Sequence, residues 1–111
     1  MTKRPIKEQE LNLVKHLLQL TSKLNFDLTK FTTVIELEDG GMGSIRFINN
    51  KPARVYGTDL VQVEYIDEDK VPVLITVTIG NHQELFELEF WKVDFGKLLR
   101  NPNPSEITIK N

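Results

Sequence analysis

The first regular pattern in the chain repeats every three to four residues. Its apolar positions are Leu11, Val14, Leu17 and Leu18, with Leu13, Leu20 and Leu24 widening the stripe. Such a stripe is typical of a helix that buries one face, and it predicts a helix over about residues 7–23. Pro5 suits the first turn of this helix. Asn25 offers a stop, because asparagine tolerates the left-handed conformation found at helix ends.

After the helix the apolar pattern alternates at every second residue, which predicts strands. The expected strands cover about residues 31–38, 44–48, 60–66, 71–79 and 84–93. Each is bounded by turn residues and rich in β-branched or aromatic side chains. The pattern therefore predicts one α+β domain over residues 1–111, with the N-terminal helix packed on an antiparallel sheet of about five strands. We expect hairpin or meander order, followed by a C-terminal tail over residues 95–111.

The alternation also limits how the last three strands pair. We expect the core face to consist of Val61, Val63, Tyr65, Val71, Val73, Ile75, Val77, Ile79, Phe86, Leu88 and Phe90. To keep these residues on one face, the link across 67–69 must contain an odd number of residues. The simplest such link has three residues and pairs Ile66 with Lys70. The link at Gly80 must contain an even number. A two-residue turn at Gly80 and Asn81 is preferred to a four-residue loop over 80–83, because both residues accept a positive φ.

The opposite face of this sheet has an unusual composition. It would present Leu74, Thr76, Thr78, Leu85, Glu87, Glu89 and Trp91. This set is too apolar for a fully solvated face and too acidic for a second core, so we expect something to cover part of it. Three coverings are open. The first is the C-terminal tail, the second is another copy of the chain, and the third is a protein partner. The apolar residues of the tail are Phe95, Leu98, Leu99, Ile107 and Ile109.

Charge is unevenly distributed along the 111 residues, although the net charge is only −2. Residues 59–94 hold nine acidic residues against Lys70 and Lys92, a local balance of −7. This excess argues against nucleic-acid binding, which needs clustered cations. The chain has no cysteine, and its longest apolar run, 71–77, is too short to span a membrane. We expect no signal peptide in the first residues, because charged residues and not an apolar run follow Pro5. We expect a soluble cytoplasmic protein.

Residues 67–102 contain most of a resemblance to a known family. The segment 85–95 reads Leu-Phe-Glu-Leu-Glu-Phe-Trp-Lys-Val-Asp-Phe. It resembles an uncharacterised bacterial family of small domains marked by a strand of roughly Leu-Phe-Glu-Leu-Asp-x-Trp-Lys-x-Asp-Phe. The loop 39–44, the stretch from Arg4 to Leu11 and Pro102 fit the same family. Glu89 replaces its usual aspartate, and Lys70 replaces a glycine that often follows the acidic turn. The resemblance implies a fold and no activity.

The residues that could perform chemistry form no convincing catalytic or metal site. Glu87 and Glu89 share a strand face with carboxyls about 6–7 Å apart, close to glycosidase spacing, but such pairs are common on exposed strands. The acidic turn 67–69 has too few oxygens for calcium, so we expect Asp67 to cap backbone amides instead. His16 and His82 lie on different elements. The glycine-rich loop 39–43 joins two strands and follows acids, unlike a phosphate loop. We expect no cofactor and no metal.

A protein-binding role is the preferred interpretation. Trp91 and Leu85, surrounded by Glu87, Glu89 and Asp94, would dock a basic partner steered by charge. The concrete form would be an immunity-type protein that neutralises a basic toxin enzyme. Two alternatives stay open, namely a small-ligand or catalytic domain that uses the two glutamates in a shallow pocket, and a structural homodimer. Trp91 could also serve only as an anchor for the tail.

Overall fold

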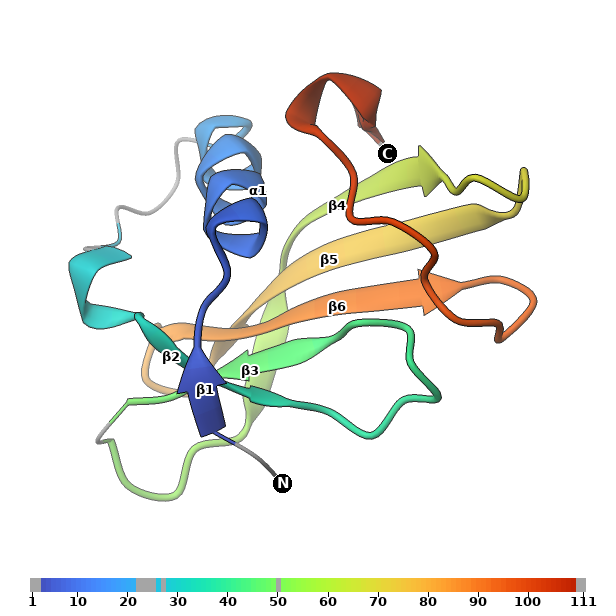
Figure 1. The fold of residues 1–111 in the computed structure, drawn as a ribbon. Coiled ribbons are helices and arrows are strands. Elements are labelled where there is room, and N and C mark those ends of the chain that lie inside the picture. Colours follow the sequence, from blue (N-terminus) through green and yellow to red (C-terminus); the bar gives the residue numbers. More distant parts are fainter. Residues whose placement is uncertain (1–2, 22–25, 27, 50, 110–111) are drawn as a thin grey trace.

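The computed structural model describes residues 3–21, 26, 28–49 and 51–109. The elements, with η for a 3-10 helix, are β1 (Lys3–Pro5), α1 (Glu8–Gln19), η1 (Leu28–Lys30), β2 (Thr33–Glu36), β3 (Ile45–Phe47), β4 (Tyr56–Ile66), β5 (Pro72–Gly80), β6 (Leu85–Lys92), η2 (Pro104–Glu106) and β7 (Thr108–Ile109). Figure 1 shows α1 lying across one face of a twisted sheet. The predicted arrangement of one N-terminal helix on an antiparallel sheet is confirmed.

The sheet has seven strands over these residues, not about five, in the order β1-β2-β3-β6-β5-β4-β7. Only β4, β5 and β6 form a meander; β2 and β3 form a hairpin that joins the sheet through β6. The predicted hairpin pairs β2–β3, β4–β5 and β5–β6 are present, and the departure from simple meander order is that β3 pairs with β6 and not with β4. The two strands that the sequence pattern missed, β1 and β7, have three and two residues. Segments this short show no alternation that could be recognised.

Helix α1 buries the predicted stripe but is shorter than expected. Leu13, Val14 and Leu17 are fully buried in the core. The helix ends at Gln19, because the amide of Leu20 turns back to the carbonyls of Leu17 and Leu18 and tightens the last turn. The predicted end at residue 23 was wrong, and the proposed stop at Asn25 lies outside the described residues. Pro5 belongs to β1, not to the first helical turn.

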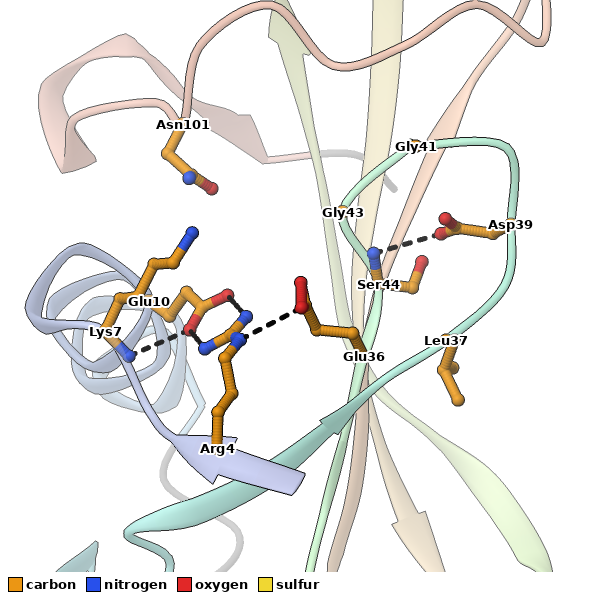
Figure 2. A pocket seen from close by; sticks show the side chains of 10 residues that line it. All are labelled: Arg4, Lys7, Glu10, Glu36, Leu37, Asp39, Gly41, Gly43, Ser44 and Asn101. Carbon is orange, nitrogen blue, oxygen red and sulfur yellow. Dashed lines mark hydrogen bonds and ion pairs between the residues drawn. The ribbon is translucent and has the colours of Figure 1, made fainter. Parts of the chain in front are cut away.

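An ion pair fastens β1 to the start of α1 (Figure 2). Arg4 donates from its two terminal nitrogens to the two carboxylate oxygens of Glu10, over 2.9 and 2.8 Å. The same Glu10 accepts the backbone N–H of Lys7, which caps the helix. The Glu10 side chain is buried with these partners. A glutamate three residues into the helix thus caps the helix and also fixes the edge strand beside it.

The core forms between α1 and the facing side of the sheet, as the alternation predicts. Of the expected core residues, those in the central cluster are Val14, Leu17, Val63, Tyr65, Val73, Ile75, Val77, Leu88 and Phe90. Ile75 lies directly between Val63 on β4 and Phe90 on β6. The parity argument therefore placed the middle of these three strands correctly.

The link between β4 and β5 is longer than the simplest prediction. Ile66 pairs with Pro72, not with Lys70, so five residues, 67–71, lie between the paired positions. The number is odd, as the pattern required. Lys70 takes φ 69°, a left-handed conformation that glycine adopts more easily. The turn is held by Asp67, which accepts the backbone N–H of Glu68 at 2.8 Å.

A bulge changes the pattern where β5 meets β6. The register shifts between Val77 and Ile79, so that Ile79 pairs with Leu85. Because a bulge inserts one extra residue, alternation reverses across it. Leu85 is therefore buried in the core, whereas Phe86 is absent from the core cluster and lies against Arg46 on the other face. The predicted faces of Leu85 and Phe86 were wrong, as was the two-residue turn, because residues 81–84 separate the strands.

The C-terminal tail packs on the helix side of the sheet. Leu98 and Ile107 pack against the core cluster, and β7 pairs with β4 through Val63 and Ile109. In Figure 1 the tail runs past the ends of β5 and β6 and returns beside α1. It does not lie across the opposite face of the sheet, so the first of the three expected coverings is wrong for the described residues.

No helix among the residues described above is long and apolar enough to cross a membrane.

Candidate functional site

The candidate site is the sheet face that points away from α1, called here the outer face. Cross-strand pairs place its side chains in rows: Arg46 beside Glu87, Gln62 beside Thr76 and Glu89, and Leu74 beside Trp91. Asp59 pairs with Thr78 at the other end. Four strands, β3 to β6, thus contribute to one surface. Two of its members, Glu87 and Glu89, are neighbours on β6 because alternation directs every second residue to the same side.

One end of the outer face is apolar and exposed. Trp91, Ile66 and Val93 have exposed fractions of 49, 47 and 43 %. Trp91 pairs across strands with the half-buried Leu74, and its ring lies 6.3 Å from that of Phe95. Phe95 is itself 70 % exposed, so this contact does not bury Trp91 under the tail. The apolar end is therefore accessible to another molecule.

Glu87 is held by Arg46, a residue that the sequence analysis overlooked. Arg46 Nε donates to Glu87 Oε2 at 2.7 Å, and the guanidinium also lies 4.8 Å from the centre of the Phe86 ring. Glu87 is 8 % exposed. It is therefore a neutralised part of the face, not a free negative charge. Alternation could have found Arg46, because it lies between the core residues Ile45 and Phe47.

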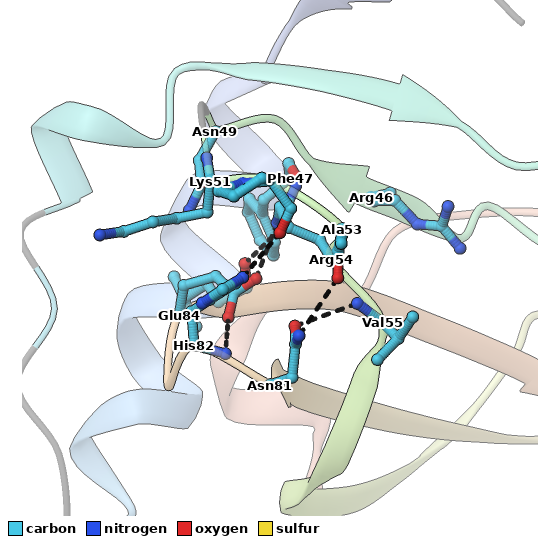
Figure 3. Close-up of polar contacts among 12 residues, drawn as sticks. Arg46, Phe47, Asn49, Lys51, Ala53, Arg54, Val55, Asn81, His82 and Glu84 are labelled. Atoms are coloured by element: carbon cyan, nitrogen blue, oxygen red, sulfur yellow. Dashed lines mark hydrogen bonds and ion pairs between the residues drawn. The ribbon is translucent and has the colours of Figure 1, made fainter.

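A second arginine fixes the far end of the same strand (Figure 3). Arg54 Nε donates to Glu84 at 2.7 Å, and its terminal nitrogens donate to the carbonyls of Phe47 and Leu85. Its guanidinium lies 5.3 Å from the Phe86 ring. Because each of its three nitrogens donates a hydrogen bond, Arg54 positions the crossover from β3 to β4.

Glu89 differs from Glu87 in its ionisation. Burial, followed by a hydrogen bond and charge repulsion from Glu87, raises the pKa of Glu89 from 4.5 to about 7, and Asp59 adds to the effect. Asp59 accepts a hydrogen bond from the Tyr56 hydroxyl at 2.9 Å. Neither Asp59 nor Glu89 has a cationic partner among the described residues. Asp59 and the ionised form of Glu89 are therefore the charges that this face offers to a basic group.

The contact between Glu87 and Glu89 bears on the catalytic alternative. The carboxyl of Glu87 contributes to the raised pKa of Glu89, so the two side chains are neighbours on the outer face. Glycosidases separate their two carboxyls by about 5–5.5 Å or by about 6.5–9.5 Å, to admit a sugar and, in inverting enzymes, a water. Glu87 is held by Arg46, and the catalytic use of the two glutamates stays a prediction.

Leu85 and Asp94 are the remaining predicted site residues, and they lie in different places. Leu85 is fully buried in the core and cannot contact a partner. Asp94 is exposed beyond the end of β6 and accepts the backbone N–H of Gly96 at 2.8 Å. The structure thus brings together Trp91, Glu87 and Glu89, places Asp94 near the apolar end and removes Leu85 from the site.

Lys92 is a buried polar residue whose position the sequence analysis did not predict. It is 1 % exposed on the core side, and its ammonium donates to Asp67 at 2.9 Å, Asp69 at 2.7 Å and the carbonyl of Lys97 at 2.9 Å. Asp67 also accepts the backbone N–H of Leu99 at 2.8 Å. The expected capping by Asp67 is confirmed, but the acidic turn mainly fastens the tail. The alternation along the strand indicates that Lys92 is on the core side, because it follows Leu88 and Phe90 at steps of two residues.

Metal-ligating side chains do not gather in the described part of the chain. No group of three or more histidine, aspartate, glutamate or cysteine residues there could hold an ion. His82 Nε2 donates to the carbonyl oxygen of Pro52 at 2.7 Å, in the tautomer that carries the proton on Nε2, and His16 lies on α1.

Comparison with known proteins yields a family and no activity. A family model described as a domain of unknown function (DUF6984) matches residues 3–102. No curated protein matches the chain, and no solved structure matches it. The match spans the opening stretch, the glycine-rich loop and the β6 segment on which the sequence resemblance depended.

Proposed function

The chain belongs to the family described as a domain of unknown function (DUF6984), and we propose that it is a protein-binding domain for a basic partner. The observation that supports this most directly is the exposure of Trp91 on a sheet face that the tail leaves open. Half-exposed tryptophans surrounded by apolar side chains are the usual anchors of protein interfaces. No catalytic set competes with this role among the described residues of the face.

The charge of the outer face indicates which kind of partner it would bind. Asp59 and Glu89 lie on the outer face without a described cation, and Asp94 lies beside its apolar end. An unneutralised acidic surface attracts basic proteins and increases the rate at which they meet. The concrete form that we propose is an immunity-type protein, in which a small domain of this kind covers and neutralises a basic toxin enzyme.

The same charges argue against the homodimer alternative. Two copies that met through their outer faces would bring Asp59 and Glu89 against the same residues of the other copy or close to them. Like charges buried together without partners are costly, and burial together with the neighbouring Glu87 and Asp59 already raises the pKa of Glu89 to about 7. A basic partner would relieve this repulsion, whereas a second copy would increase it.

The test needs a defined probe, which is the purified basic protein encoded by a gene adjacent to that of this chain. Binding kinetics would be measured by surface plasmon resonance with wild-type protein and Trp91→Ala. We expect Trp91→Ala to speed dissociation and to raise Kd by about 30-fold or more, the equivalent of about 2 kcal/mol for a central anchor. An unchanged Kd would exclude Trp91 from the interface.

Charge reversal gives a second, independent readout. Asp59→Lys should slow association and reduce its dependence on salt, because peripheral charges act mainly on the encounter. Glu87 is unsuitable for this experiment, since its reversal would also break the pair with Arg46. Glu8→Lys, an equal change on the exposed side of α1, is the matched control and should leave association unchanged. Equal slowing by both variants would mean that only net charge matters.

A further inference from the structure

A small cavity lies on the helix side of the molecule, away from the outer face. It has a volume of about 170 Å³ and is bordered by the start of α1, the end of β2, the glycine-rich loop after β2 and the tail at Asn101. Figure 2 shows that side chains from α1, β1 and β2 are directed towards the same space. The network around Arg4 and Glu10 forms its floor. None of these groups contributes to the proposed protein-binding face.

The α1 side of the cavity supplies a positive charge. The Lys7 side chain extends across the cavity towards the amide of Asn101 (Figure 2). Its backbone N–H is engaged by Glu10, but its ammonium pairs with no carboxylate of the described residues. An ammonium beside a side-chain amide is a donor set that suits a carboxylate.

The β2 side supplies a negative charge. Glu36 has a side chain that is 56 % exposed, and its one ion pair, to Arg4 Nε, is long at 3.4 Å. That Nε is buried and has no hydrogen-bond partner, because the guanidinium is oriented by its two bonds to Glu10. Glu36 therefore keeps most of its capacity to accept hydrogen bonds. Its neighbour Asp39 does not, since its two oxygens accept the amides of Met42 and Ser44.

The charges that are left uncompensated at the cavity have opposite signs and belong to different elements. The Arg4–Glu10 pair is neutral, and both oxygens of the Asp39 carboxylate are occupied by backbone amides, so Lys7 and Glu36 are the charged groups that keep free hydrogen-bonding capacity. A simple anion would leave Glu36 unmatched, and a simple cation would leave Lys7 unmatched. A ligand that has both charges satisfies both residues.

We propose that this cavity binds a small zwitterion of the α-amino acid class. The carboxylate of the ligand lies at Lys7 and Asn101, and its ammonium lies at Glu36. Size restricts the class, because a cavity of about 150 Å³ holds benzene, a molecule of about six heavy atoms. Glycine, L-alanine and L-serine are therefore the ligands of appropriate size.

Thermal unfolding of the full chain tests the proposal with named probes. Glycine, L-alanine and L-serine would each be added at millimolar concentration, beside acetate, propionate and ethylamine as probes that have only one of the two charges. We expect at least one of the three amino acids to raise Tm by about 5 °C or more at saturation, because ligand binding stabilises the folded state. The single-charge probes should leave Tm unchanged. No shift with any amino acid, or an equal shift with acetate or ethylamine, would overturn the proposal.

Two exposed residues allow the site to be altered without endangering the fold. Lys7→Met and Glu36→Gln should each weaken binding of the active amino acid by about tenfold or more, as measured by calorimetry. Lys15→Met and Glu8→Gln change the same charges on exposed positions of α1 outside the cavity and should bind like wild type. Circular dichroism confirms that each variant is folded. Wild-type affinity in both Lys7→Met and Glu36→Gln would overturn the assignment of the site.

Discussion

Glu89 has the most strongly perturbed carboxyl on the outer face, and its ionisation affects stability. Burial and the contact with Glu87 raise its pKa from 4.5 to about 7, so the folded state holds its proton more tightly than the unfolded state. Stability from this group is complete below about pH 4.5 and is lost as pH rises towards 7. Glu89→Gln should therefore be more stable than wild type at pH 8, by about 1–2 kcal/mol after allowance for solvent screening.

Urea unfolding of Glu89→Gln at pH 4.5 and at pH 8 measures this effect. The two proteins should be similar at the lower pH and differ at the higher one. Glu38→Gln, at an exposed position near the glycine-rich loop, is the control and should show no such difference. A Glu89→Gln variant that is less stable than wild type at pH 8 would contradict the assigned ionisation.

Trp91 and Phe90 are adjacent in sequence but occupy opposite faces. Trp91 is 49 % exposed, whereas Phe90 is 2 % exposed within the core. Trp91→Ala should cost about 1 kcal/mol, because it removes a half-solvated side chain and leaves no enclosed cavity. Phe90→Ala should cost about 3–5 kcal/mol. Equal losses in chemical denaturation would mean that Trp91 anchors the tail after all.

At the scale of elements, Lys92 joins three segments that are distant along the chain. From β6 it contacts the turn at Asp67 and the tail at Lys97, and Asp67 in turn holds the amide of Leu99. Burial alone would raise the pKa of Asp67, but the bonds from Leu99 and Lys92 lower it below 3.8. The stabilisation is therefore complete above about pH 4 and is lost as pH falls further.

Lys92→Met tests this connection. It leaves Asp67 buried without its cation, which typically costs about 3–5 kcal/mol. Hydrogen exchange at the amide of Leu99 should become faster than in wild type, because the tail loses its attachment. Lys97→Met is the control, since Lys97 takes part only through its carbonyl. Unchanged exchange at Leu99 in Lys92→Met would show that the tail is held elsewhere.

At the scale of the whole molecule, the sheet has one face for the core and one for solvent. Ile75 is fully buried at the centre of the core face. Ile75→Ala should destabilise the protein by about 2–4 kcal/mol through lost burial and a residual cavity, measured by urea denaturation. A loss below about half a kcal/mol is typical of an exposed site and would mean that the two faces are exchanged.

Removal of the tail separates the two faces experimentally. Truncation after Arg100 deletes the buried Pro102, the core contact of Ile107 and strand β7. Tm should fall by several degrees, while the fluorescence of the single tryptophan, Trp91, should keep its wild-type emission maximum in the folded protein. A marked red shift in the folded truncated protein would place the tail over the outer face.

Much of the fold was predictable because it depends on local alternation. The buried stripe of α1 and the core residues Val63, Ile75 and Leu88 follow from periods of 3.6 and 2. The site was predictable only in part. Trp91 and Glu89 were found, but Arg46 was overlooked and Leu85 was placed on the wrong face. The register shift between Val77 and Ile79 explains the second error, because nothing local marks the residue at which alternation reverses.

The sequence by itself determined which residues could be buried, since the spacing of apolar side chains is a property of neighbouring positions. It therefore determined one helix, a mainly antiparallel sheet and the existence of an acidic face. Only the tertiary structure decided the strand order, the two short edge strands, the side on which the tail packs and the partner of each charge. These depend on contacts between segments that are distant along the chain, such as Lys92 with Asp67 and Arg46 with Glu87. Pairing at that range is set by the free energy of the whole packed core, which no short stretch of sequence contains.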